Sequence, residues 1–119
     1  MNVLLVDDEP TIRKMMKAML QSRGFRIIDA GSGADALALS QQYPIDLLVT
    51  DVVMGDMDGA TLAHSLVERN PNLPVLFISG YPMDFEKERR LYARSNFLPK
   101  PFQASELIHA VRDLTRPAD

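Results

Sequence analysis

The 119-residue sequence predicts an α/β fold, in which a five-stranded parallel sheet lies between two layers of helices. Short apolar runs alternate five times with segments whose apolar residues recur at helical spacing. The connections are too short for a second domain, so we expect a single domain over residues 1–119. Polar residues stand at the ends of the apolar runs, where an open parallel sheet places its ligand site.

The first strand and helix follow from an apolar run and a helical stripe. Residues 2–6 form the strand, and Pro10 suits the first turn of a helix. Gly24 ends this helix, because Gly readily adopts the left-handed conformation. The expected inner face, in which we interpret the methionines as core packing, consists of Ile12, Met15, Met16, Met19 and Leu20.

The next two strands lead into different kinds of segment. Residues 25–30 form the second strand, in which Asp29 is the only acid, and a small stripe of Ala34, Leu37 and Ala38 marks the second helix. The third strand, residues 45–49, is an apolar run of the kind found in buried parallel strands. It leads directly into Asp51, which we take as the working residue.

The second half of the chain contains one weak element. A third helix is expected over about residues 59–70 and a fourth strand over 75–78. Residues 84–94 are mostly charged and have a poor apolar stripe, so this helix has the weakest pattern. A very short strand at 97–98 precedes the last helix, whose apolar face is Leu107, Ile108, Val111 and Leu114.

Composition excludes several classes of function. The net charge of −3 and the pI of about 5.3 argue against direct contact with nucleic acid. The absence of cysteine excludes disulfides and thiol chemistry, and His64 and His109 fall in different predicted helices, which argues against a histidine metal site. No apolar run approaches the ~20 residues of a membrane span, and no secretory leader is visible, so we expect a cytoplasmic protein.

Acidic, hydroxyl and amine side chains stand at the ends of four predicted strands. Asp7 and Asp8 follow the first strand, Asp51 the third, Ser79 the fourth and Lys100 the fifth. In a sheet of order 2-1-3-4-5 these four strands are neighbours, and the topological switch point lies between strands 1 and 3. All five side chains would then converge there.

These residue types together fit a phosphoryl group. Crowded carboxylates repel one another, and Mg²⁺ relieves this by binding one or two of them together with a phosphate oxygen. A lysine and a hydroxyl can stabilise the remaining phosphoryl oxygens. Since neither a cysteine nor a histidine base is available, Asp51 is the natural acceptor, as an aspartyl-phosphate.

Four strings carry a family resemblance: VLLVDDEP, DLLVTDVVMGDMDG, VLFISGYP and FLPKPF. In this order and spacing they resemble the receiver domain of two-component response regulators over essentially the whole chain. The resemblance implies a flavodoxin-like three-layer sandwich. It also implies that Asp51 accepts a phosphoryl group from a phosphohistidine of a histidine kinase or phosphotransfer protein. The chain would be a signalling domain that promotes only its own phosphorylation and dephosphorylation.

The same resemblance implies a role for each site residue. Mg²⁺ would be held by Asp7 or Asp8, with Asp8 the more direct ligand, together with Asp51 and the backbone carbonyl of Val53. Lys100 would contact the phosphoryl oxygens, and the Lys100–Pro101 bond would be cis.

A switch is implied as well. Ser79 would move toward the phosphoryl group, and Phe97 would change rotamer with it. The face formed by the fourth helix, the fifth strand and the fifth helix would then be read by a downstream protein.

Two positions depart from the family pattern. Gly55 stands where the family commonly has proline, which predicts a more mobile loop after Asp51. Phe97 replaces a frequent tyrosine, so no phenolic hydroxyl is available for output. The SGYP string resembles receivers fused to hybrid sensor kinases more than those of transcription factors.

Other interpretations stay open at this point. Ser79 could simply cap a turn and Phe97 could be ordinary core, while Asp56 and Asp58 are expected to shape a turn and not to bind metal. The fold could serve as a protein-binding module that is never phosphorylated. A hydrolase of the haloacid dehalogenase type would need a second Asp where Val53 stands. A free-standing phosphorelay shuttle and a domain excised from a larger protein would look the same.

Overall fold

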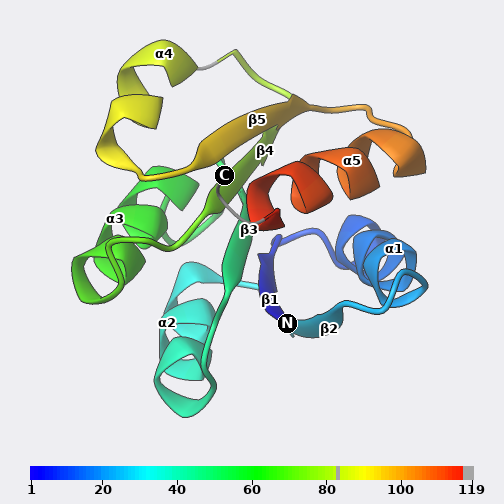
Figure 1. Ribbon diagram of the computed structural model, residues 1–119, viewed down its shortest axis with the longest axis horizontal. Coiled ribbons are helices and arrows are strands. Elements are labelled where there is room, and N and C mark those ends of the chain that lie inside the picture. The colour runs from blue at the N-terminus through cyan, green and yellow to red at the C-terminus, as the bar shows by residue number, and fades with distance from the viewer. Residues whose placement is uncertain (83, 117–119) are drawn as a thin grey trace.

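The computed structural model describes residues 1–82 and 84–116 and contains one five-stranded sheet among them (Figure 1). All neighbouring strands are parallel and their order is β2-β1-β3-β4-β5, as predicted. The strands are β1 (Asn2–Val6), β2 (Arg26–Ala30), β3 (Leu47–Asp51), β4 (Val75–Ser79) and β5 (Ser95–Pro99). The switch point therefore lies between β1 and β3.

The helices form two layers, one on each face of the sheet. They are α1 (Pro10–Gln21), α2 (Gly33–Gln42), α3 (Gly59–Arg69), α4 (Phe85–Glu88) and α5 (Ala104–Thr115), with a 3₁₀ turn, η1 (Arg89–Leu91), after α4. Figure 1 shows α1 and α5 on one side of the sheet and α2, α3 and α4 on the other. No helix within the described ranges is both long enough and apolar enough to cross a membrane.

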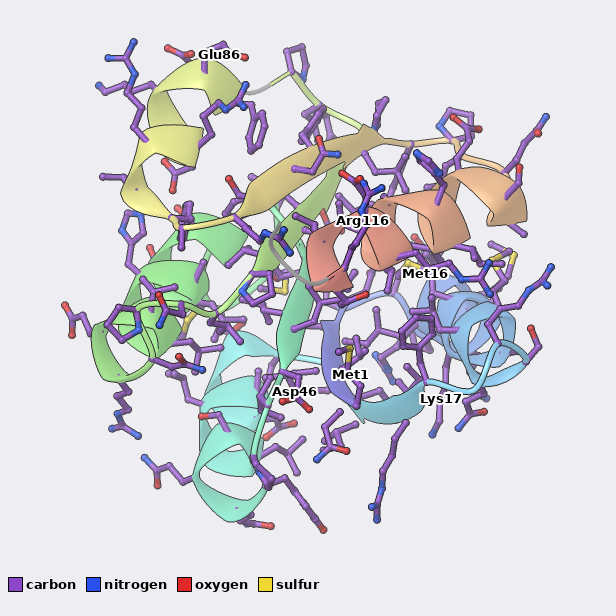
Figure 2. All side chains as sticks on the ribbon, viewed as in Figure 1. Met1, Met16, Lys17, Asp46, Glu86 and Arg116 are labelled. Atoms are coloured by element: carbon purple, nitrogen blue, oxygen red, sulfur yellow. The ribbon has the colours of Figure 1, made fainter. Side chains whose placement is uncertain are left out.

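Alternation along the strands divides the core in two. In β1, Val3 and Leu5 point into the core under α1 and α5, whereas Leu4 and Val6 point into the core under α2 and α3. All four side chains are fully buried, as expected for a sheet covered on both faces. Met16 lies in the first core, between α1 and α5 (Figure 2).

The structure corrects the expectations for β3, for β5, for the helix over 84–94 and for Met15. β3 ends two residues later than predicted, so Asp51 is its last residue, and β5 extends over five residues, Ser95–Pro99. The expected helix over 84–94 shrinks to the four residues of α4 and one 3₁₀ turn, because charged side chains without an apolar stripe gain little from packing. Met15 is 47% exposed, so its assignment to the core was wrong.

Candidate metal and phosphoacceptor site

Parallel pairing of β1 and β3 brings two acids side by side at the carboxyl edge of the sheet. Val6 is paired with Thr50, so Asp7 and Asp51 follow on adjacent strands. Ligand oxygens of Asp7, Asp8 and Asp51 all lie within 4.8 Å of one another. The structure thus brings together the three carboxylates that the sequence predicted to converge.

One ammonium group joins the two buried acids. Lys100 Nζ lies 3.0 Å from Asp51 Oδ2 and 3.2 Å from Asp7 Oδ2. The other oxygen of Asp7 accepts a hydrogen bond from the amide of Glu9 at 2.9 Å, and that of Asp51 accepts from the amide of Val53 at 3.3 Å. Asp8 is exposed. Three carboxylates against one ammonium leave the cluster negatively charged.

Lys100 is placed by the strand next to it. Its amide donates to the carbonyl of Ser79 at 2.9 Å, and the Lys100–Pro101 bond is cis, as the resemblance implied. Burial works against the charged amine, but the hydrogen bond to Asp51 and the charge of Asp7 outweigh it and raise the pKa of Lys100. The ammonium form is therefore stabilised at neutral pH.

The two expected switch residues, Ser79 and Phe97, make different contacts. Ser79 ends β4 and is 2% exposed, and its hydroxyl accepts a hydrogen bond from the amide of Tyr81 at 3.0 Å. Here it holds the turn after β4. Phe97 packs into the core under α3 and α4, with its ring centre 6.1 Å from that of Phe85.

The loop between β3 and α3 is fastened to the start of α2. Asp56 accepts hydrogen bonds from the amides of Gly33 at 3.1 Å and Ala34 at 3.0 Å, and these amides lower the pKa of its carboxyl. A Cβ on Gly33 would lie 2.3 Å from Cγ of Met57. Asp58 accepts from the amide of Thr61 and caps α3. Both acids shape the loop, as expected, but the link from Asp56 to α2 was not foreseen.

The same loop closes on itself beside Asp51. The amide of Gly59 donates to the carbonyl of Val52 at 2.8 Å. A Cβ at residue 59 would lie only 2.2 Å from the carbonyl oxygen of Asp51. Only glycine fits this approach of α3 to the end of β3.

The donor set fits a hard divalent cation. Carboxylate oxygens are the ligands that Mg²⁺ prefers, and one or two protein carboxylates with several waters are its usual shell. Asp7 and Asp51 are nearly buried, at 0% and 8% exposure, whereas Asp8 is open to solvent. A cation bound here could keep water ligands on its open side. Asp7, Asp8 and Asp51 therefore fit Mg²⁺.

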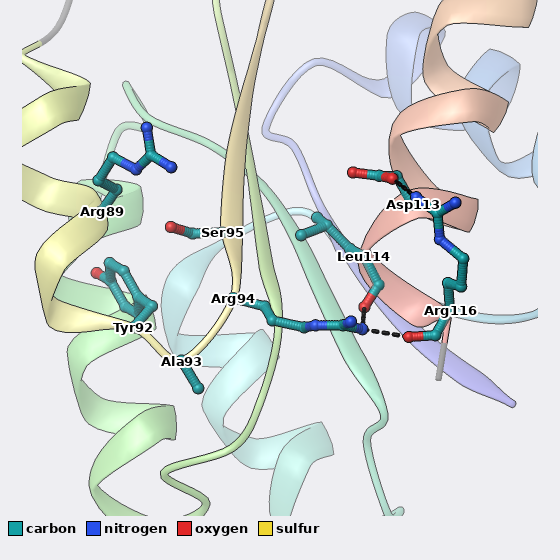
Figure 3. Close-up of a pocket in the computed structure, with 8 residues that line it drawn as sticks. All are labelled: Arg89, Tyr92, Ala93, Arg94, Ser95, Asp113, Leu114 and Arg116. Carbon is teal, nitrogen blue, oxygen red and sulfur yellow. Dashed lines mark hydrogen bonds and ion pairs between the residues drawn. The ribbon is translucent and has the colours of Figure 1, made fainter. Parts of the chain in front are cut away.

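Two cavities flank different ends of the sheet. One of about 260 Å³ is mostly apolar and lies next to the site, lined by Ile12, Met15, Lys100, Pro101 and Phe102. Another, of about 380 Å³, lies at the opposite end of β5 (Figure 3). There the Arg94 guanidinium donates to the carbonyls of Leu114 and Arg116, so it satisfies the end of α5.

Comparisons of the sequence with known proteins all indicate the same family. Residues 3–112 match the response regulator receiver domain. The chain is 38% identical over 120 residues to the sensor kinase CckA of Brucella abortus, covering 98% of this chain and 13% of that protein. It is 29% identical to the response regulator receiver protein CpdR of the same organism, covering 94% of each. The chain thus spans a small part of one relative and nearly all of another.

Solved structures agree with the sequence matches. The receiver domain of the hybrid histidine kinase CckA superposes with a TM-score of 0.84 at 31% identity, covering 98% of this chain and 100% of that one. The chemotaxis protein CheY4 of Vibrio cholerae gives 0.87 at 28% identity, with 95% and 97% covered. With its sheet order and its acidic cluster, the chain belongs to the response regulator receiver domain family.

Proposed function

We propose that this chain accepts a phosphoryl group on Asp51 from a phosphohistidine of a histidine kinase or phosphotransfer protein, in a Mg²⁺-dependent reaction in the cytoplasm. The observation that carries this is the Lys100 ammonium, 3.0 Å from Asp51 and 3.2 Å from Asp7, beside the exposed Asp8. Two nearly buried acids and one open acid around a cation suit a site that takes in a phosphoryl group and a metal ion together.

Accessibility supports Asp51 as the acceptor. The Asp7 side chain is fully buried, with 0% of its surface exposed. The side chain of Asp51 retains 11% exposure, next to the ammonium that would neutralise an incoming phosphoryl group. Asp8 is open and free to serve as metal ligand, with the carbonyl of Val53 as a further ligand.

The transfer itself is a displacement at phosphorus. A carboxylate oxygen of Asp51 forms the new O–P bond while the P–N bond to imidazole breaks, and the imidazole nitrogen takes up a proton from solvent. Bound Mg²⁺ supplies charge neutralisation for the phosphoryl oxygens. Lys100 would exchange one carboxylate partner for a phosphoryl oxygen, and Asp7 and Asp8 would hold the metal ion.

The subsequent switch would run through Ser79 and Phe97. Ser79 gives up the amide of Tyr81 and donates its hydroxyl proton to the phosphoryl group, and Phe97 then changes rotamer toward the vacated space. The weak packing of α4 supports this, because a segment that changes state needs low local stability. The face of α4, β5 and α5 would be read by a downstream protein partner, without direct contact to nucleic acid.

The apolar cavity beside Lys100 supports a place for the phosphohistidine donor. Met15 is 47% exposed and borders this cavity with Ile12 and Phe102, and Lys100 of the site lines the same cavity. Exposed apolar surface next to a reactive group is typical of a docking surface. We therefore propose that the donor protein covers α1 and the loop before α5, and that residues 1–119 act as one receiver unit.

Labelling with acetyl phosphate tests the acceptor. With Mg²⁺, the wild type should gain one phosphoryl group per chain by intact mass, and Asp51→Asn should gain none. Removal of Mg²⁺ with a chelator should abolish the labelling of the wild type. An Asp51→Asn variant that is still labelled on aspartate would refute the assignment, and multiple turnover of a generic phosphomonoester would indicate a hydrolase.

A second comparison tests the docking surface. Met15→Ser should slow transfer from a phosphorylated phosphotransfer protein but leave labelling by acetyl phosphate unchanged, because the small donor needs no protein contact. Tyr43→Ser is the matched control, since Tyr43 is 44% exposed at the end of α2. Equal rates of protein-to-protein transfer in the wild type and Met15→Ser would contradict the docking surface.

A further inference from the structure

The β1–α1 loop, which carries two of the three acids, is held by a side chain that the proposed function leaves unused. Arg13 lies in the first turns of α1, and its side chain is 19% exposed. Its Nη1 donates to the backbone carbonyl of Asp7 at 2.7 Å, and its Nε donates to Asp29 Oδ2 at 3.2 Å. One guanidinium therefore ties α1, the end of β1 and the end of β2 together.

The surroundings of the Arg13 guanidinium also favour its position. Asp29 also accepts from Lys17 Nζ at 3.0 Å, and Lys17 projects from the side of α1 near β2 (Figure 2). Burial alone would raise the pKa of Asp29, but the hydrogen bond and charge of Lys17, with Arg13, lower it. A Cβ on Gly31 would lie 3.0 Å from Nη1 of Arg13, so the glycine leaves room for the guanidinium.

The carbonyl that Arg13 holds belongs to the peptide between Asp7 and Asp8. A peptide unit is planar, so a hydrogen bond that fixes its oxygen also fixes its nitrogen, which is the backbone nitrogen of Asp8. The amide of Asp7 is bound to the carbonyl of Ala30 at 3.2 Å, and its carboxylate to Glu9 and Lys100. Arg13 thus fixes the peptide plane that leads into the exposed Asp8.

We infer that Arg13 is a positioning residue for the acidic cluster: its bond to the Asp7 carbonyl, anchored by Asp29, sets the Asp7–Asp8 peptide and so the carboxylate geometry that Mg²⁺ requires. This inference rests on the proposed function, because it concerns the same metal ion. It assigns Asp29, the lone acid of β2, as the anchor of Arg13. Groups that orient metal ligands without touching the metal commonly affect affinity strongly.

Charge alone predicts the opposite effect, which makes the test sharp. Removing a cation near three carboxylates should strengthen the binding of a divalent cation. Removing a positioning contact should weaken it. We therefore expect Arg13→Met to lower Mg²⁺ affinity about tenfold, the low end of the effect seen for groups that orient metal ligands.

Lys17→Met is the matched control, because it removes the same charge from the same anchor but makes no contact with Asp7. Its Mg²⁺ affinity should stay within about twofold of the wild type, since a half-exposed charge that is already paired with Asp29 is largely screened. Asp29→Asn leaves Arg13 without its charged anchor, and its Mg²⁺ affinity should lie between those of Arg13→Met and Lys17→Met. Affinity is measured by Mg²⁺ titration of the purified protein, followed by amide NMR shifts and, independently, by calorimetry.

Three further readouts separate positioning from damage to the fold. Thermal unfolding without Mg²⁺ should show that Arg13→Met and Lys17→Met both remain folded at the temperature of the titration, so that unfolding does not explain the affinity. Labelling of Arg13→Met by acetyl phosphate should recover at saturating Mg²⁺, because Asp51 and Lys100 are unchanged. Arg13→Lys should restore affinity only in part, since one ammonium lacks the fork that spans Asp7 and Asp29.

The inference is overturned if Arg13→Met binds Mg²⁺ as tightly as the wild type, or if Lys17→Met loses as much Mg²⁺ affinity as Arg13→Met. The proposed function still stands in that case, provided that Asp51→Asn binds Mg²⁺ more weakly than the wild type. If Asp51→Asn binds Mg²⁺ as the wild type does, or if the wild type binds none, the proposed function fails and the inference fails with it.

Discussion

The two helices that flank β5 differ sharply in how they are held. α5 has twelve residues, five of them buried, and Glu106 accepts from the amide of Gln103 at 2.9 Å to close its first turn. α4 has four residues, and none of residues 85–91, all of which the structure describes, is buried. One side of the edge strand β5 is therefore covered by the firmly packed α5, whereas its other side is covered by α4, which has little packing.

α4 is held instead at a few polar and aromatic points. The Glu88 carboxylate accepts from the hydroxyl of Tyr92 and contacts His64 Nε2 on α3, each at 2.8 Å. Burial and the Glu88 carboxylate raise the pKa of Tyr92, so its hydroxyl keeps the proton that it donates. Its ring lies edge-on to Phe77 with centres 5.5 Å apart. Such contacts can exchange partners more easily than a packed apolar face can.

The largest expected difference is in core stability. Leu107→Ala on α5 removes a fully buried side chain and should lower the free energy of unfolding by about 3 kcal/mol. Leu91→Ala in η1 removes one that is 56% exposed and should change it by less than about 0.5 kcal/mol. Urea unfolding of the metal-free proteins measures both. Comparable losses in the two variants would mean that the α4 side is packed as firmly as α5.

An intermediate effect is expected at Lys100, in the loop that leads into α5. Lys100→Met leaves Asp7 and Asp51 without their shared cation and should cost about 2 kcal/mol in metal-free protein, less than for a fully buried pair because water reaches the amine. Mg²⁺ should restore much of this loss, since it takes over the neutralisation of the two acids. A stability loss that Mg²⁺ does not reduce would contradict this account.

The pH dependence of the free energy of unfolding tests the same interaction between Lys100 and the two acids. The pKa of Lys100 is raised above its ordinary 10.5, so its contribution is fully present below that pH and is lost as pH rises through the higher folded value. The wild type should therefore lose stability relative to Lys100→Met above about pH 10.5, and the difference should be constant near neutral pH. Urea unfolding across this alkaline range measures it.

The smallest effect is expected at the polar attachment of α4. Tyr92→Phe removes the hydrogen bond to Glu88 and should cost about 1 kcal/mol. Hydrogen exchange should accelerate for the amides of α4 and η1 and stay unchanged in α5, because the contact is local. Tyr43→Phe, at an exposed site on α2, should change neither. Equal acceleration in α5 would show that the two helices open together.

Apolar runs and helical stripes were sufficient to predict which segments form strands and helices and that the three acids stand at strand ends. The sheet order followed from the family resemblance. The sequence pattern misjudged the end of β3 because Thr50 and Asp51 are polar yet buried, paired with Phe77 and Ile78 of β4. It overestimated the helix over 84–94 because charged residues suit a helix without giving it a face to bury.

Contacts between segments that are distant in the chain could not be predicted from the sequence. Arg13 and the Asp7 carbonyl meet only because α1 folds back over β1, and Asp56 reaches Gly33 only because α2 and the β3–α3 loop are neighbours. No spacing rule predicts such pairs. Asp29 was noticed as the one acid of its strand, but its partners could not be named without coordinates. Whether Gly55 makes the loop more mobile stays a prediction.

The closed loop between Val52 and Gly59 has a consequence for protein engineering. At residue 59 an added methyl group would collide with the main-chain carbonyl of Asp51, which cannot rotate aside as a side chain does. Saturation mutagenesis should therefore find this site intolerant even of alanine. A residue larger than glycine at position 59 should become acceptable only in variants that lengthen the segment between Val52 and Gly59.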